Sequence, residues 1–204
     1  MRIGILGGAF DPPHKGHLNL ALNAFDQLKL DQVILVPYSE SPGERFEKPV
    51  PIKHRLKMLD LLIGKSTQIS VSDIELTRGG KSYTVDTIEE IKLAYEKAHL
   101  WLIMGSDSFN NFPDWKLPEK IVSMCRLAVG MRTQQKRNLL EGKMTEEFKE
   151  QVDFIDQEPS NVSSRDIRRA IHFNDFLKPD WLTPEVHEYI KKHNLYKYEY
   201  SRKS

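Results

Sequence analysis

Residues 2–36, RIGILGGAFDPPHKGHLNLALNAFDQLKLDQVILV, decide the fold class of this chain. An apolar run over 2–6 ends at a pair of glycines, as a short buried strand does. After two prolines, apolar side chains recur at helical spacing along one face, at Leu18, Ala21, Leu22, Phe25 and Leu28. A second apolar run follows over 32–36. A strand, a helix and a strand in this order predict a βαβ unit whose strands run parallel in one sheet.

The same alternation continues along the rest of the chain. Further patterns predict helices over 51–62 and 84–97 and strands over 99–104 and 126–131. Thr183-Pro184-Glu185 has the form of a helix start, with the threonine as N-cap. We therefore predict an α/β protein with a three-layer, Rossmann-like architecture and a central, mostly parallel sheet. Residues 1–204 are expected to form one domain, with a C-terminal helical part at about 163–196.

Two stretches depart from this alternation. Residues 38–51 are rich in proline and are expected to form a long surface loop. Residues 132–151 are charged and rich in glutamine, which is typical of a solvated helix or a mobile insert.

The composition is that of a globular protein, since 39% of the 204 residues are hydrophobic and 29% are charged. Thirty Lys and Arg against 29 Asp and Glu give a net charge of +1, which argues against a nucleic-acid or membrane-surface binder. No apolar stretch approaches the roughly 20 residues of a transmembrane helix, and no signal-peptide cleavage site follows the apolar start. The single cysteine, Cys125, lies in an apolar run, as a core residue in a reducing compartment does. We predict a soluble, cytoplasmic protein with no nucleic-acid or membrane partner; whether it forms a homo-oligomer is left open.

The loops after the strands should carry the chemistry, because ligands bind outside the carboxyl ends of the strands in such sheets. The first of these loops reads GGAFDPPHKGH over 7–17. Its glycines let the backbone approach a ligand closely, and His14 and His17 share a face at a helix start. Imidazole donors beside the free N–H groups of a helix N-terminus predict an anion site, and polyphosphate is the natural anion.

Other interpretations of this loop are weaker. It matches neither the dinucleotide-binding GxGxxG fingerprint nor a Walker A loop. Zinc would need a third ligand beside His14 and His17, and the nearby sequence supplies none. A plain Gly-Pro turn with two surface histidines would not explain why the pair falls at the expected ligand edge.

A second cluster, VSSRDIRR, covers 162–169. Ser163 and Asp166 form a capping box, which is a structural role in its own right. The two serine hydroxyls and Arg168, one turn into the helix, add the donors of a second phosphate site.

Two more clusters are candidates for ligand contacts, and each also has a purely structural interpretation. RGGKSYTVDT over 78–87 opens a helix with Thr84 as its expected N-cap, and by itself fits a loop and a cap. GSDSF over 105–109 follows a predicted strand. Phe109 and Phe112 have the spacing of a core stripe, which Pro113 interrupts, leaving Trp115 as a wall for stacking.

Taken together, these motifs resemble the HxGH nucleotidyltransferase superfamily and, more closely, its bacterial nicotinate-nucleotide adenylyltransferases. The loop at 7–17 points to the superfamily, whereas Ser82-Tyr83-Thr84 and Trp115 point to this member. The other matching segments are His54-Arg55-Leu56 with Met58, Asp86-Thr87, Gly105 with Asp107 and Ser108, Arg132, and Ser163-Ser164 with Ile167 and Arg168.

The resemblance implies a nucleotidyltransferase fold and transfer of AMP from ATP to nicotinate mononucleotide, which gives nicotinate adenine dinucleotide and pyrophosphate in NAD biosynthesis. The mononucleotide phosphate would attack the α-phosphate of ATP in line, with Mg²⁺ carried on ATP and no metal site in the protein. The implied catalytic residues are His14, His17 and Arg168. The implied ATP-binding residues are Gly8, Ala9, Phe10, His14, His17, Gly105, Asp107, Ser163, Ser164 and Arg168. The implied acceptor-binding residues are Tyr83, Thr84, Asp107, Trp115 and Arg132.

Two departures from the family's pattern and two other functions stay open. The loop at 38–51 lacks the family's basic Pro-Pro-His-Lys segment, and the sequence leaves open which of Arg45 and Lys48, if either, replaces that contact. Arg165 stands where the family usually has threonine. An adenylyl- or cytidylyltransferase for another phosphorylated acceptor would share these motifs. A non-catalytic nucleotide sensor would keep the fold, but the intact histidines argue against it. An aminoacyl-tRNA synthetase is disfavoured because no segment resembles a tRNA-binding domain.

Overall fold

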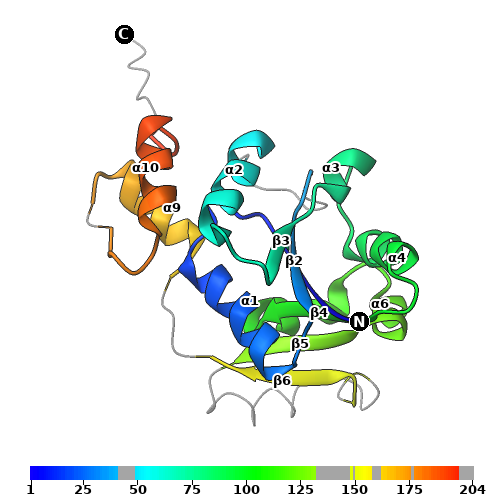
Figure 1. The fold of residues 1–204 in the computed structure, drawn as a ribbon. Coiled ribbons are helices and arrows are strands. Elements are labelled where there is room, and N and C mark those ends of the chain that lie inside the picture. The colour runs from blue at the N-terminus through cyan, green and yellow to red at the C-terminus, as the bar shows by residue number, and fades with distance from the viewer. Residues whose placement is uncertain (41–48, 132–147, 149, 158–161, 176, 198–204) are drawn as a thin grey trace.

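The centre of the molecule is a six-stranded sheet in the order β3-β2-β1-β4-β5-β6, in which every neighbouring pair is parallel (Figure 1). It is seen in a computed structural model that describes residues 1–40, 49–131, 148, 150–157, 162–175 and 177–197. The strands are β1 (Arg2–Gly8), β2 (Gln32–Pro37), β3 (Ile69–Val71), β4 (His99–Gly105), β5 (Arg126–Met131) and β6 (Val152–Asp156). This is the order of a doubly wound, Rossmann-like sheet, and it turns back on itself between β1 and β4.

Helices cover both faces of the sheet and make the outer two of three layers. The helices are α1 (Lys15–Gln27), α2 (Ile52–Ile63), α3 (Ile74–Arg78), α4 (Thr84–Ala94), α5 (Ser106–Asn110), α6 (Pro118–Met124), α9 (Ser164–His172) and α10 (Pro184–Lys192), with a 3₁₀ turn, η1, at Phe112–Asp114. Side chains of α1 and α2 pack on one face, and those of α4, α5 and α6 pack on the other. Among the described helices, none is long and apolar enough to cross a membrane.

Each central strand contributes side chains to both cores. In β4, Leu100, Leu102 and Met104 belong to the core under α4, whereas Trp101 and Ile103 belong to the core under α1. Successive side chains of a strand point to opposite faces, so a strand covered on both faces has to be apolar throughout. The continuous apolar runs in the sequence follow from this requirement.

The C-terminal helices form a third, smaller core against α2 (Figure 1). Met58 and Leu62 of α2 pack there with Ile167 of α9 and with Val186 and Ile190 of α10. Both helix starts match their sequence signals, because the Ser163 hydroxyl accepts from the Asp166 N–H and the Thr183 hydroxyl accepts from the Val186 N–H.

Most of the predicted elements are confirmed, including the strands at 2–6, 32–36, 99–104 and 126–131. Cys125 is buried as expected, and this burial raises the pKa of its thiol to about 12. The predicted N-cap at Thr84 is wrong: Tyr83 is the N-cap, and Thr84 is the first helical residue. Of the stretch 132–151, residues 132–147 and 149 lie outside the described part of the chain, and so do residues 41–48 of the predicted surface loop.

Strands β3 and β6 were not predicted from the sequence. β3 has only three residues, too few for a periodic pattern. β6 reads VDFID, with acids at its second and last positions, which breaks the apolar run expected of a buried strand. Its Asp153 accepts hydrogen bonds from Trp101 Nε1 of β4 at 2.8 Å and from Arg126 Nε of β5 at 2.6 Å, and these two side chains satisfy the carboxylate.

Two substitutions on α4 test the buried face of this helix. Ile91 is 3% exposed in the core, whereas Leu93 is 75% exposed on the same helix. We expect Ile91→Ala to lower the free energy of unfolding by about 2–5 kcal/mol through lost burial and a cavity. Leu93→Ala should change it by about 0.5 kcal/mol or less. Urea denaturation measures both, and equal losses would contradict this placement of α4.

Candidate active site

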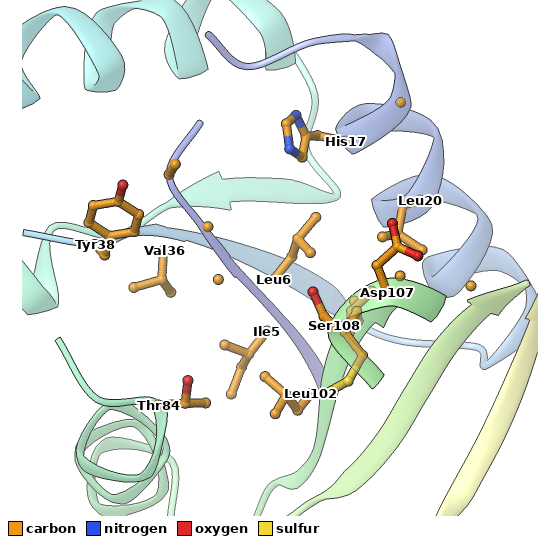
Figure 2. Close-up of a pocket in the computed structure, with 18 of the residues that line it drawn as sticks. Ile5, Leu6, His17, Leu20, Val36, Tyr38, Thr84, Leu102, Asp107 and Ser108 are labelled. Carbon is orange, nitrogen blue, oxygen red and sulfur yellow. The ribbon is translucent and has the colours of Figure 1, made fainter. Parts of the chain in front are cut away.

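A cleft of about 940 Å³ opens at the carboxyl ends of β1 and β4, where the strand order reverses (Figure 2). Its floor includes the strand-end glycines Gly7, Gly8 and Gly105. Figure 2 shows Thr84 to one side of β1 and His17 to the other. Because α4 and α1 cover opposite faces of the sheet, the cleft joins the two faces across the ends of the strands.

Most of the site residues expected from the sequence line this cleft. Those that do so are Gly8, Ala9, His14, His17, Thr84, Gly105, Asp107, Trp115, Ser163 and Ser164. Phe10 lies in the core instead, and its ring packs edge-on against His17 at 5.0 Å. The Tyr83 ring packs on the core beneath α4, with Lys116 Nζ 4.1 Å from its centroid. Arg132 lies outside the described residues.

The two histidines stack on each other, with ring centroids 3.7 Å apart. The backbone N–H of His14 donates to Nδ1 of His17 at 3.2 Å. A ring nitrogen that accepts a hydrogen bond carries no proton, so neutral His17 has its proton on Nε2. This arrangement assigns the Nε2–H of His17 as the donor for a ligand.

Burial keeps both imidazoles neutral near pH 7. It lowers the pKa of His14 to about 4. It also lowers the pKa of His17 well below 6.5, and the neighbouring His14 lowers it further. In this state the pair provides N–H donors rather than positive charges, and an anionic ligand would favour their protonation.

Gly16 between the histidines lets the start of α9 approach them. A Cβ at this position would lie 2.9 Å from Val162 Cγ1 and 3.0 Å from His14 Nδ1. The Ser164 hydroxyl donates to the carbonyl of Pro12 at 2.8 Å, which ties α9 to the same loop. The Ser163 hydroxyl donates to Asp166 at 2.7 Å. Both hydroxyl protons therefore point to protein acceptors, and the first backbone N–H groups of α9 are the donors that remain for a ligand.

Buried polar contacts hold the loop over 7–17 in place, and sequence reasoning missed most of them. Arg55 is only 1% exposed and donates through Nη1 to the carbonyls of Ala9, at 2.9 Å, and Tyr38, at 3.0 Å. Asp11 is also buried; its Oδ1 accepts from the Tyr196 hydroxyl at 2.8 Å. Arg168 donates to the Asp11 carbonyl at 2.8 Å and does not line the cleft. The sequence held one signal of these buried contacts: Arg55 is a charged residue on the apolar face of a predicted helix.

The other end of the cleft is lined by α4 and its surroundings. Thr84, Thr87 and Ile88 face it from α4, together with Trp115, whose ring lies 5.5 Å from that of Phe112. Although Thr84 is not the N-cap, the N–H groups of the first helical turn still have few helical acceptors. Glu75 of α3 also lines this end, and the sequence offered no sign of it.

Comparison with known proteins places the chain in a class and then in a family. A family model described as cytidylyltransferase-like matches residues 5–170. The chain is therefore a nucleotidyltransferase of the cytidylyltransferase-like class. A "Probable nicotinate-nucleotide adenylyltransferase" of Borrelia garinii is 36% identical over 197 residues, which cover 96% of this chain and 95% of the relative. A protein of Dictyoglomus turgidum with the same name is also 36% identical over 197 residues, 96% of each chain. The chain belongs to the nicotinate-nucleotide adenylyltransferase family.

Solved structures support the fold. The Plasmodium falciparum nicotinic acid mononucleotide adenylyltransferase complexed with NaAD has a TM-score of 0.75 at 20% identity, covering 96% of this chain and 97% of that one. The same enzyme complexed with APC also has a TM-score of 0.75. The fold class and the enzyme class predicted from the sequence are thus confirmed.

The neutral state of His14 predicts how stability depends on pH. Between about pH 6.5 and pH 4, an unfolded chain binds a proton at this histidine and the folded chain does not. The free energy of unfolding should therefore fall as the pH is lowered through this window, by about 1.4 kcal/mol per pH unit for each such histidine. His14→Asn should reduce the slope of the free energy of unfolding against pH by the contribution of one proton, about 1.4 kcal/mol per pH unit. Urea denaturation at several pH values tests this, and an unchanged slope would show that His14 is not held neutral.

Proposed function

We propose that this protein transfers AMP from ATP to nicotinate mononucleotide, which yields nicotinate adenine dinucleotide and pyrophosphate for NAD biosynthesis. The observation that carries the proposal is the continuity of one cleft across β1 and β4. One end holds the stacked histidines and the start of α9, and the other holds Trp115 and the start of α4. A single cleft with an anion-binding end and an aromatic end suits the joining of two nucleotides.

The reaction needs positioned donors rather than a general base. The second pKa of a phosphate monoester is about 6, so the mononucleotide phosphate is already an anion near pH 7. Its oxygen forms a bond to the α-phosphorus of ATP while the bond from that phosphorus to the bridging oxygen breaks, and pyrophosphate leaves. The protein's task is to align two phosphates of like charge and to stabilise the charge on the leaving group.

His17 and His14 are placed to stabilise that charge. We assign the Nε2–H of His17 to the triphosphate, because Nδ1 of this ring is already occupied by the backbone of His14. The N-terminus of α9 adds the first backbone N–H groups of that helix; in α1 the Lys15 N–H already donates to the Trp181 carbonyl at 3.0 Å, which leaves the N–H of Gly16 and the helix dipole. Arg168 lies one helical turn after Ser164, on the same side of α9, and we assign its charge to the triphosphate as well. Gly105 and Asp107, which also line the cleft, are assigned to the nucleotide.

Magnesium enters this proposal as part of the ATP substrate. Within the described part of the chain, no three His, Cys, Asp or Glu side chains are grouped so that they could hold a metal ion. Asp107 lines the ATP end of the cleft and offers one carboxylate. One carboxylate suits Mg²⁺ whose other ligands are phosphate oxygens and water.

The acceptor end suits a pyridine carboxylate. The N–H groups of Thr84 and Val85 open α4 without helical partners, and the helix dipole favours an anion there. Trp115 is assigned to stack on the ring, Tyr83 to flank the carboxylate and Arg132 to reach the mononucleotide phosphate. A cytoplasmic location fits the single unpaired cysteine, Cys125.

Replacement of His17 tests the triphosphate assignment. We expect His17→Ala to fold normally and to lose about 100- to 1,000-fold in kcat, the usual effect of removing one donor to a transition state. The exposed His99, at the amino end of β4, is the matched control, and His99→Ala should retain wild-type turnover. A pyrophosphate-release assay with ATP, magnesium and nicotinate mononucleotide measures both. Near-normal turnover in a folded His17→Ala protein would overturn the assignment.

The choice of acceptor tests the assignment at α4. The enzyme should prefer nicotinate mononucleotide to its nicotinamide counterpart by about ten- to several-hundred-fold in kcat/KM, because a carboxamide sets an NH2 group against the helix N–H donors. Trp115→Ala should weaken both acceptors and preserve their ratio, since stacking does not distinguish the rings. Equal kcat/KM values for the two acceptors in the wild-type enzyme would refute the assignment.

A further inference from the structure

Glu75 is a buried carboxylate that the chemistry described so far does not use. It is only 6% exposed, it belongs to α3, and it lines the acceptor end of the cleft. Its Oε1 accepts a hydrogen bond from the Thr87 hydroxyl at 2.5 Å. Its Oε2 is buried and has no hydrogen-bond partner among the residues that the structure describes. A buried carboxylate oxygen in this position is costly unless something else interacts with it.

The surrounding charges do not neutralise this carboxylate. Arg78 Nη2 lies 3.9 Å from Glu75 Oε1, but Arg78 Nη1 pairs more closely with Glu90, at 2.8 Å. Arg78 Nη2 also donates to the Thr87 hydroxyl at 3.1 Å. One guanidinium thus serves two carboxylates. Lys116 pairs with Asp86 instead, at 3.4 Å.

The position of Glu75 relative to α4 matters as much as its charge. Thr84, Thr87 and Ile88 line the cleft from one face of α4. Thr87 holds Glu75, and Thr84 lies about one helical turn nearer the start of the helix, a distance of about 5 Å along the axis. The acceptor end therefore presents a helix N-terminus, which favours negative charge, and close to it a carboxylate, which favours positive charge.

We propose that Glu75 is the counter-ion of the acceptor's pyridinium ring and selects acceptors whose ring is positively charged. This inference rests on the proposed function and extends it. An N-ribosylated nicotinate is a zwitterion, with a cationic ring nitrogen and an anionic carboxylate. The start of α4 takes the carboxylate, and Glu75 faces the ring. Both interactions strengthen when the stacked ring excludes water.

A purely structural role for Glu75 would look different in one respect. The Thr87 hydroxyl, whose single proton is directed to Glu75 at 2.5 Å, also lies 3.4 Å from the carbonyl of Tyr83, so Glu75 could act only by holding the first turn of α4. Such a role would affect every acceptor alike, whatever the charge of its ring. The 1,4-dihydropyridine form of nicotinate mononucleotide keeps the carboxylate, ribose and phosphate but has a neutral ring, and it separates the two roles.

The experiment compares kcat/KM for the pyridinium and dihydropyridine acceptors in three proteins, with ATP and magnesium saturating. Glu75→Gln removes the charge and keeps an oxygen that can accept from Thr87. Glu89→Gln is the matched control, because Glu89 is a partly exposed glutamate of α4 that pairs with Lys120 and does not line the cleft. Thermal denaturation verifies that all three are folded.

We expect Glu75→Gln to lower kcat/KM for nicotinate mononucleotide by about 10- to 100-fold, mainly through KM. The dihydropyridine acceptor should change by about threefold or less, so the preference for the charged ring collapses, and Glu89→Gln should behave as wild type. Equal losses for both acceptors would overturn the inference in favour of a structural role, and no loss for either would exclude any role. If the wild-type enzyme released no pyrophosphate with nicotinate mononucleotide, the proposed function would fail first, and that result does not depend on the variants.

Discussion

The site exists because β1 and β4 end side by side while the chain leaves them towards opposite faces of the sheet. From β1 the chain passes to α1, whose side chains pack on one face. From β4 it passes to α5, where Phe109 packs on the other face. The carboxyl ends of these two strands are therefore left uncovered, which is the general reason why ligands bind at this point of a doubly wound sheet.

The loop that closes β1 keeps its shape through contacts that are distant in sequence. Arg55 of α2 donates to the carbonyl of Ala9 within the loop and to that of Tyr38 just after β2. Tyr196, from the C-terminal region, donates to Asp11 within the loop. Buried carbonyl and carboxyl groups cost free energy unless they are paired, so these contacts favour one arrangement of the loop. Tyr196, which follows α10, thus helps to position the histidine loop from the far end of the chain.

The two ends of the cleft favour ligands of different charge, and this difference matches the substrates of the proposed reaction. At the ATP end, neutral histidines and helix N-termini offer N–H donors to polyphosphate. At the acceptor end, the start of α4 favours an anion and Glu75 favours a cation. A zwitterionic pyridine nucleotide fits the second end, and a triphosphate fits the first. The two ends lie in one cavity, which is what a transfer between two nucleotides requires.

Sequence alone determined the features that arise from neighbouring residues. The βαβ start, the caps at Ser163 and Thr183 and the pairing of His14 with His17 depend on spacings of a few residues, so periodicity and local hydrogen bonding reveal them. Tertiary structure alone decided the edge strands β3 and β6, the helix start at Tyr83 and the burial of Glu75. In a sequence, a charged residue on a helix looks solvated. Whether it is buried depends on which segments pack over it, and those contacts join parts of the chain that no local pattern connects.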